Sequence, residues 1–255
     1  MFAPAHLRAP RRDRAILSGS LVGIALVAWL ALWAWHGSPA GHYLGHGHAG
    51  DGGPVAYEAA LFTAGWILMI IAMMLPSSVP LVVTFGVLVG RRRRPGVLVA
   101  LLLMGYLLVW GVFGLGAWLA DRVIHAAVHA LPWLAAHPQV IIATTLLAAG
   151  LWQFSPLRDR CLDECRSPLG FVLNRWRGTA ERREAVAMGI AHGAFCVGCC
   201  WSLMLVMFGV GLGNVSAMLA LGGLTAIEKN FAWGRRLTGP LGVALVLAAV
   251  YAVAS

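Results

Sequence analysis

Seven apolar stretches, separated by short basic clusters, constrain this chain more than any other feature of its sequence. They cover approximately residues 16–36, 58–90, 96–120, 139–154, 185–209, 215–231 and 238–254. A membrane-spanning helix needs about 20 predominantly apolar residues. Only 11% of the 255 residues are charged, whereas soluble domains carry about 25%. The pattern therefore predicts an all-α polytopic membrane protein, folded as a single bundle of about seven transmembrane helices.

Positive charges fall almost entirely on one side of this predicted bundle. With the N-terminus in the cytoplasm and the C-terminus outside, eighteen of the nineteen Lys and Arg residues lie on the cytoplasmic side, and Arg122 is the exception. Cytoplasmic loops of membrane proteins carry such an excess of Lys and Arg. The net charge of +9 thus indicates topology rather than nucleic-acid binding, and the apolar surface predicts the lipid bilayer as a partner.

Histidines are concentrated in two segments that this topology places outside. They are His42, His46 and His48 in the Gly-rich segment 37–55, and His125 and His129 in the segment 121–138. Imidazole is a common metal ligand, and residues four apart share a helical face. We therefore consider these histidines for external metal capture. A solvated linker and an interfacial amphipathic turn are the alternative interpretations.

The stretch 58–90 is too long for one straight helix across the bilayer core. Pro76 and Pro80 predict a kink or a break near Ser77, because proline removes a helical hydrogen bond. Met69 and Met73 share one face just before this point. They are candidate metal ligands, and gap-filling side chains in the bundle are the alternative.

The basic segment 155–184 is predicted to be cytoplasmic. Ser155 followed by Pro156 is a typical helix start, and Pro168 favours an end before it. The sequence therefore predicts a short helix over 156–166, with Cys161 and Cys165 on one face.

The stretch 192–207 holds three of the five cysteines of the chain. On a helix, three- and four-residue steps form one stripe of Met188, His192, Cys196, Cys199, Cys200 and Met204. Thiolate, thioether and imidazole suit Cu(I) and, less well, Zn(II). The stripe lies close to the middle of the predicted fifth span, so we interpret it as an intramembrane metal site.

Three other interpretations remain open at this point. Cys196 and Cys199 form a C-x-x-C pair, which favours thiol–disulfide or quinone-linked redox chemistry. The stripe also fits packing against a partner subunit in a non-catalytic assembly role. Glu228 either pairs locally with Lys229 or lies on an ion or proton path. No ATP-binding loop or catalytic triad is evident, and we do not expect an enzyme.

Four blocks resemble a bacterial family of predicted metal-binding integral membrane proteins. They are Trp66…Met69…Ala72-Met-Met-Leu-Pro76; Gln153-Phe-Ser-Pro-Leu157 with Cys161-Leu-Asp-Glu-Cys-Arg166 and Pro168; Gly189…His192-Gly…Cys196-Val-Gly-Cys-Cys-Trp-Ser-Leu-Met204; and Gly213-Asn214…Met218 with Glu228-Lys229. The resemblance implies a multispan bundle in the bacterial plasma (inner) membrane. It also implies the handling or delivery of a metal ion, with copper favoured.

These observations lead to one hypothesis for the path of copper. External histidines collect the ion, which passes to a soft site of Cys196, Cys199, Cys200, His192 and the methionines Met69, Met73 and Met204. Cys161 and Cys165 hold it at the cytoplasmic mouth, and movement in the opposite direction fits equally well. The expected partner is a cuproenzyme or a soluble metallochaperone.

Overall fold

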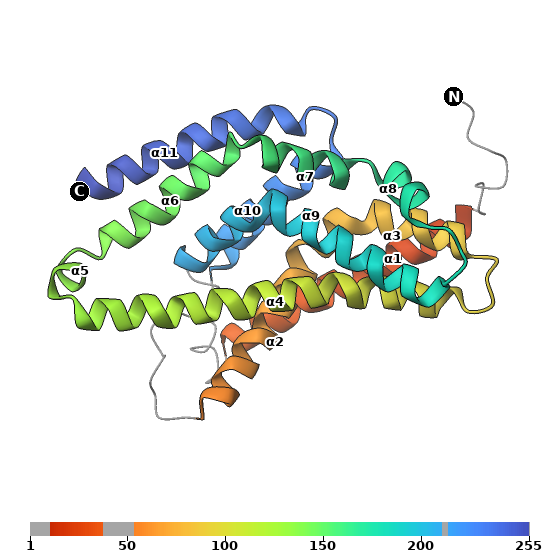
Figure 1. Cartoon of the computed structure of the whole chain (residues 1–255), viewed down its shortest axis with the longest axis horizontal. Helices are drawn as coiled ribbons and strands as arrows, with labels where there is room; N and C mark the ends of the chain where they lie inside the picture. Colours follow the sequence, from red (N-terminus) through yellow and green to blue (C-terminus); the bar gives the residue numbers. More distant parts are fainter. Residues whose placement is uncertain (1–10, 38–53, 211–213, 255) are drawn as a thin grey trace.

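The computed structural model describes residues 11–37, 54–210 and 214–254, and this part of the chain is all-helical (Figure 1). Its α-helices are α1 (Arg11–His36), α2 (Val55–Met73), α3 (Leu75–Val89), α4 (Pro95–Ala130), α5 (Pro132–Ala136), α6 (Gln139–Gln153), α7 (Pro156–Arg166), α8 (Pro168–Arg175), α9 (Glu181–Val210), α10 (Val215–Asn230) and α11 (Thr238–Ala254). A 3-10 helix, Gly234–Leu237, precedes α11. The expectation of an all-α fold is thus confirmed.

Five helices of the described residues are long and apolar enough to cross a membrane. They are α1, α2, α4, α9, and α11 together with the 3-10 turn before it. A sixth span results if α6 and α7, which are bent by 65° at their junction, form one broken span. The predicted count of seven is not confirmed, because α10 has only 16 residues and carries two charged residues near its end.

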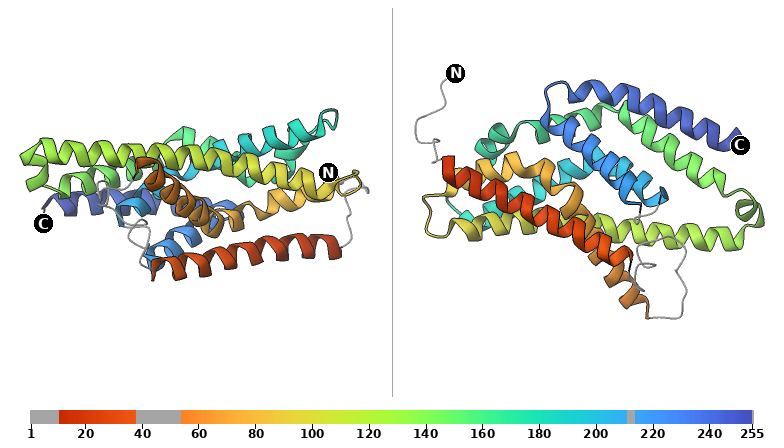
Figure 2. Two further views of the ribbon diagram at one scale, coloured as in Figure 1. Left: turned by 90° about the horizontal axis from the view of Figure 1, so that it is seen from below. Right: turned by 180° about the vertical axis from the view of Figure 1, so that it is seen from behind.

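The centre of the bundle is the pair α4 and α9, which lie side by side along the long axis (Figure 1). Their backbones approach closely at two glycines. A β-carbon at Gly189 would lie 2.0 Å from the carbonyl oxygen of Leu102, and one at Gly105 would lie 2.5 Å from that of Val186. Small residues permit such close helix contact in membranes. The pair therefore forms a tight scaffold against which α2, α3, α6 and α7 pack, while α11 packs on α6 and α1 lies at the edge against α2 and α3 (Figure 2).

The helix is interrupted at Met74, between α2 and α3, in the region where the sequence predicts a kink or a break. Pro76 lies in the first turn of α3 and cannot donate a backbone hydrogen bond. The carbonyl oxygen of Ala72, which a helical amide at position 76 would reach, accepts instead from the indole nitrogen of Trp29 at 3.1 Å. The hydroxyls of Ser77 and Ser78 donate to the carbonyl oxygen of Met74 at 2.8 and 3.2 Å. These bonds stabilise an irregular backbone inside the protein, where it is tolerated because it is not exposed to lipid.

Helix α7 begins where the sequence predicts it, with Ser155 as the N-cap accepting a hydrogen bond from the amide of Leu157. The bend at its start directs α7 back onto α9. A second short helix, α8, then follows, so the basic segment 155–184 is more ordered than a loop with one helix.

The predicted loop at 121–138 is partly wrong, because α4 continues as a helix to Ala130. No helix-breaking residue occurs before Leu131-Pro132. The charges in this part of α4 are accommodated by partners, since Arg122 lies 3.1 Å from the carboxylate of Glu58 on α2. Charged residues there do not end the helix.

Candidate metal centre

All five cysteines gather at one place, between α7 and α9. Cys196, Cys199 and Cys200 on α9 are fully buried. Cys161 on α7 packs on Gly198, where a β-carbon would lie 2.5 Å from its sulfur. Cys165 is half-buried and lies beside Cys199. We call these five residues the cysteine cluster. The two groups of cysteines that the sequence assigns to separate positions are therefore adjacent.

The thiols of Cys199 and Cys200 turn toward the same point on α9. Both donate to the backbone carbonyl of Cys196, at 3.1 and 2.8 Å. This back-bonding to the preceding turn brings the two sulfurs to the side of the helix on which Cys196 lies. These local hydrogen bonds therefore bring together the thiols of Cys199 and Cys200, which are consecutive residues of the helix.

Lys229 on α10 reaches into the cysteine cluster. Its ammonium nitrogen lies 3.0 Å from the sulfur of Cys196 and 3.5 Å from the hydroxyl of Ser77, and the residue is only 5% exposed. A buried ammonium is costly unless an anionic or polar partner compensates it. Sequence reasoning considered Lys229 only as a partner of Glu228. One signal was available, because Lys229 is the single lysine in a chain with eighteen arginines.

Tyr106 and His192 line the other side of Cys196. The hydroxyl of Tyr106 lies 3.2 Å from the Cys196 sulfur, and its ring stacks on His192 with 5.4 Å between centroids. His192 Nε2 lies 3.1 Å from the hydroxyl of Ser78, while its Nδ1 is buried and has no hydrogen-bond partner among the described residues. The contact of Nε2 with Ser78 thus orients the imidazole ring, and Nδ1 is left without a hydrogen-bond partner among the described residues.

Met74, at the break between α2 and α3, supplies the thioether nearest to a cysteine among the contacts of this site. Its sulfur lies 3.8 Å from that of Cys200. Met69, Met73 and Met204 are buried in the same core cluster. The sequence singled out Met69 and Met73 because they share a face with Pro76. Their neighbour Met74, which lies at the break, contacts the thiol of Cys200.

Glu228 forms a buried ion pair with Arg158 of α7. Arg158 and Glu228 are 0% and 2% exposed, and 2.7 Å separates guanidinium nitrogen and carboxylate oxygen. Thr238 donates to the other carboxylate oxygen at 3.1 Å and accepts from Arg158 at 3.1 Å. Arg166 donates to the Glu228 carbonyl oxygen. The local Glu228–Lys229 pair that the sequence left open is therefore wrong, and its assignment to an ion path stays a prediction.

Replacement of Arg158 by methionine is expected to destabilise the protein by about 3–5 kcal/mol, because it leaves the Glu228 carboxylate buried without its partner. Denaturant unfolding in detergent measures the change. Arg160→Met is the matched control, since Arg160 lies on the same helix but is exposed, and we expect it to change stability by less than about 0.5 kcal/mol. Equal effects of the two substitutions would contradict a structural role for the pair.

Among the described residues, neither His125 nor His129 is joined to the cysteine cluster. His125 Nδ1 lies 2.9 Å from the carbonyl oxygen of Asp121, near the end of α4. His42, His46 and His48 lie outside the described residues. Among residues 11–37, 54–210 and 214–254, no three His, Cys, Asp or Glu side chains are arranged as a ready-made metal site.

Comparison with protein-family models finds a match over residues 63–252 to the model PpoB2, described as a copper chaperone. The matched region contains every cysteine, Met74 and Lys229. Searches of curated proteins and of solved structures find no match.

Proposed function

Since the chain belongs to the PpoB2 copper chaperone family, we propose that its cysteine cluster carries Cu(I) within the membrane and delivers it to a cuproenzyme or a soluble metallochaperone. The observation that carries this proposal is the contact of Lys229 with Cys196 inside a buried group of sulfur atoms. Soft thiolate and thioether ligands suit Cu(I), although thiolates also bind Zn(II). Copper is the cargo of this site.

The proposed ligands are thiolates of α9 with support from a thioether. Two of the three residues Cys196, Cys199 and Cys200 supply the thiolates, from sulfurs that already face one side of α9. Met74 lies against Cys200 and completes a low-coordinate sulfur environment. Met69, Met73, Met204 and His192 remain proposed contributors from the same core. Zn(II) is the disfavoured alternative, because it prefers four ligands in a closed tetrahedral site.

Lys229 supports copper binding through charge. A Cu(I) ion held by two thiolates carries one net negative charge, which is costly to bury unless a cation lies next to it. The ammonium of Lys229, 3.0 Å from Cys196, makes the assembly neutral. A Zn(II) ion with the same two thiolates is already neutral, so Lys229 would leave an uncompensated positive charge. This charge balance favours monovalent copper.

Helix α7 offers a route between the buried ligands and the surface. Cys199 lies beside Cys165, which is half-buried, whereas Cys196 is fully buried. Copper can therefore exchange between neighbouring thiols of α9 and α7 without leaving sulfur ligands. We propose that Cys161 and Cys165 form the cytoplasmic end of this path, in the orientation that the arginine distribution favours. The external histidines, including His42, His46 and His48, remain proposed capture residues.

Competition between the purified protein and a Cu(I) chelator under reducing conditions tests the proposal. We expect wild-type protein to retain copper against the chelator and to lose it in favour of the chelator as the pH falls, because thiolate ligands must be deprotonated to bind. A protein that retains no copper at any pH would overturn the proposal.

Substitution of Met74 by leucine is expected to weaken Cu(I) binding by roughly tenfold. This is the lower end of the roughly 10- to 100-fold loss of metal affinity that follows removal of a residue supporting a metal site. Leucine keeps a similar volume, so the fold is retained. Met69→Leu is the comparison variant, because Met69 is buried in the same core cluster and is the ligand that the sequence favours. Should Met69→Leu weaken binding while Met74→Leu does not, the assignment from sequence would be right and the Met74–Cys200 contact would be packing.

A further inference from the structure

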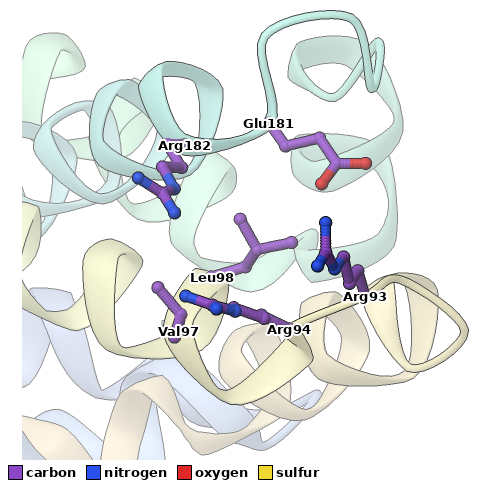
Figure 3. A pocket seen from close by; sticks show the side chains of 6 residues that line it. All are labelled: Arg93, Arg94, Val97, Leu98, Glu181 and Arg182. Carbon is purple, nitrogen blue, oxygen red and sulfur yellow. The ribbon is translucent and has the colours of Figure 1, made fainter.

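A basic pocket lies where the turn before α4 meets the start of α9, away from the cysteine cluster. Figure 3 shows its lining, which consists of Arg93, Arg94, Val97, Leu98, Glu181 and Arg182. Its volume is about 270 Å³. It is larger than a single ordered water requires, so it accommodates a group of several atoms.

Three guanidinium groups of this pocket are not used by the fold. Arg93, Arg94 and Arg182 have no ion pair or side-chain hydrogen bond to any described residue. The one carboxylate of the lining belongs to Glu181, and Arg92 compensates it at 3.0 Å. The pocket therefore carries an unbalanced positive charge.

Two further features define the ligand that fits. Helix α4 starts at this pocket, and no described side chain caps its first turn, so its free amide groups and its dipole favour an anion. The lining also includes two apolar residues, namely Val97, which is 42% exposed, and Leu98, which is buried. The pocket thus combines an anion-binding rim with an apolar wall at the end of a membrane-spanning helix.

We propose that this pocket binds a phosphate group, because planar guanidinium groups match phosphate oxygens in bidentate geometry. Two sources of that group are available at a membrane surface, namely the headgroup of an anionic phospholipid and free phosphate. Basic pockets between transmembrane helices on the cytoplasmic side recognise anionic headgroups, and the apolar wall would receive the acyl chain. This site is independent of copper binding.

The test uses the full chain in nanodiscs of phosphatidylcholine with or without phosphatidylglycerol. Native mass spectrometry counts the phosphatidylglycerol molecules retained, and calorimetry in phosphatidylcholine nanodiscs measures the binding of inorganic phosphate. Arg94→Gln/Arg182→Gln removes two arginines of the pocket. Arg91→Gln/Arg183→Gln removes the same charge from exposed positions one to three residues away and is the matched control.

We expect the pocket variant to lower phosphatidylglycerol retention by about tenfold or more, since it loses two arginines worth about fivefold each. The control variant is expected to lower it by much less, because Arg91 and Arg183 do not line the pocket. If instead only inorganic phosphate binds, and only while Arg94 and Arg182 are present, the site is a free-phosphate site. Equal losses in both variants would indicate diffuse surface attraction and overturn the proposal, as would no loss in either. Unfolding curves of both variants show whether they keep the fold.

Discussion

Replacement of Cys196, Cys199 and Cys200 together by serine is expected to abolish tight Cu(I) binding. Serine keeps the size of the side chain but removes the soft sulfur that Cu(I) prefers. The loss should exceed the roughly 10- to 100-fold that removal of a partner outside the ligand set typically costs. Competition with a Cu(I) chelator, followed by elemental analysis of the protein fraction, measures the effect.

The control for this substitution is His42→Ala/His46→Ala/His48→Ala, which removes the histidines of segment 37–55. We expect this variant to hold Cu(I) as tightly as the wild-type protein and to differ only in the rate of uptake. The opposite result, with copper retained by the cysteine variant and lost by the histidine variant, would place the tight site in the external segment.

Replacement of Lys229 by methionine is expected to lower Cu(I) affinity by roughly 10- to 100-fold without lowering Zn(II) affinity. Methionine matches the apolar stem of lysine but leaves the negative charge of the copper–thiolate unit without compensation. Parallel chelator competitions with the two metals measure the shift in selectivity. The loss is expected to be specific for copper because the zinc–thiolate unit needs no counter-charge.

Lys229→Arg is the matched variant, because it keeps the positive charge next to Cys196. We expect it to recover most of the preference for Cu(I) over Zn(II). Equal losses for both metals in Lys229→Met, together with a lower unfolding midpoint, would indicate that Lys229 only holds α10 against α9 and would contradict the charge-balance argument.

Local signals predicted much of the helical fold. Ser155 and Pro156 define the start of α7 through an N-cap and a first-turn proline. Pro76 indicated the break after α2 through its missing amide hydrogen. The end of α4 was misjudged, because charged and histidine residues were interpreted as a loop although the residues up to Ala130 contain no breaker.

The contacts of the candidate site could not be read from spacing. Arg158 was placed on a short helix of the basic cytoplasmic segment, yet the bend before α7 brings it to Glu228, 70 residues further along the chain. Met74 lies at the break after α2, and its contact with Cys200 joins residues 126 positions apart in the sequence. Such pairings depend on how α7, α9 and α10 pack, and periodicity within one helix carries no information about them.

X-ray absorption at the copper edge of the Cu(I)-loaded wild-type protein tests the central claim most directly, because it reports the atoms bonded to the metal. Copper in the cysteine cluster predicts a low-coordinate shell dominated by sulfur, which disappears in Cys196→Ser/Cys199→Ser/Cys200→Ser. A shell of nitrogen and oxygen atoms in the wild-type protein, unchanged in that variant, would contradict an intramembrane thiolate site.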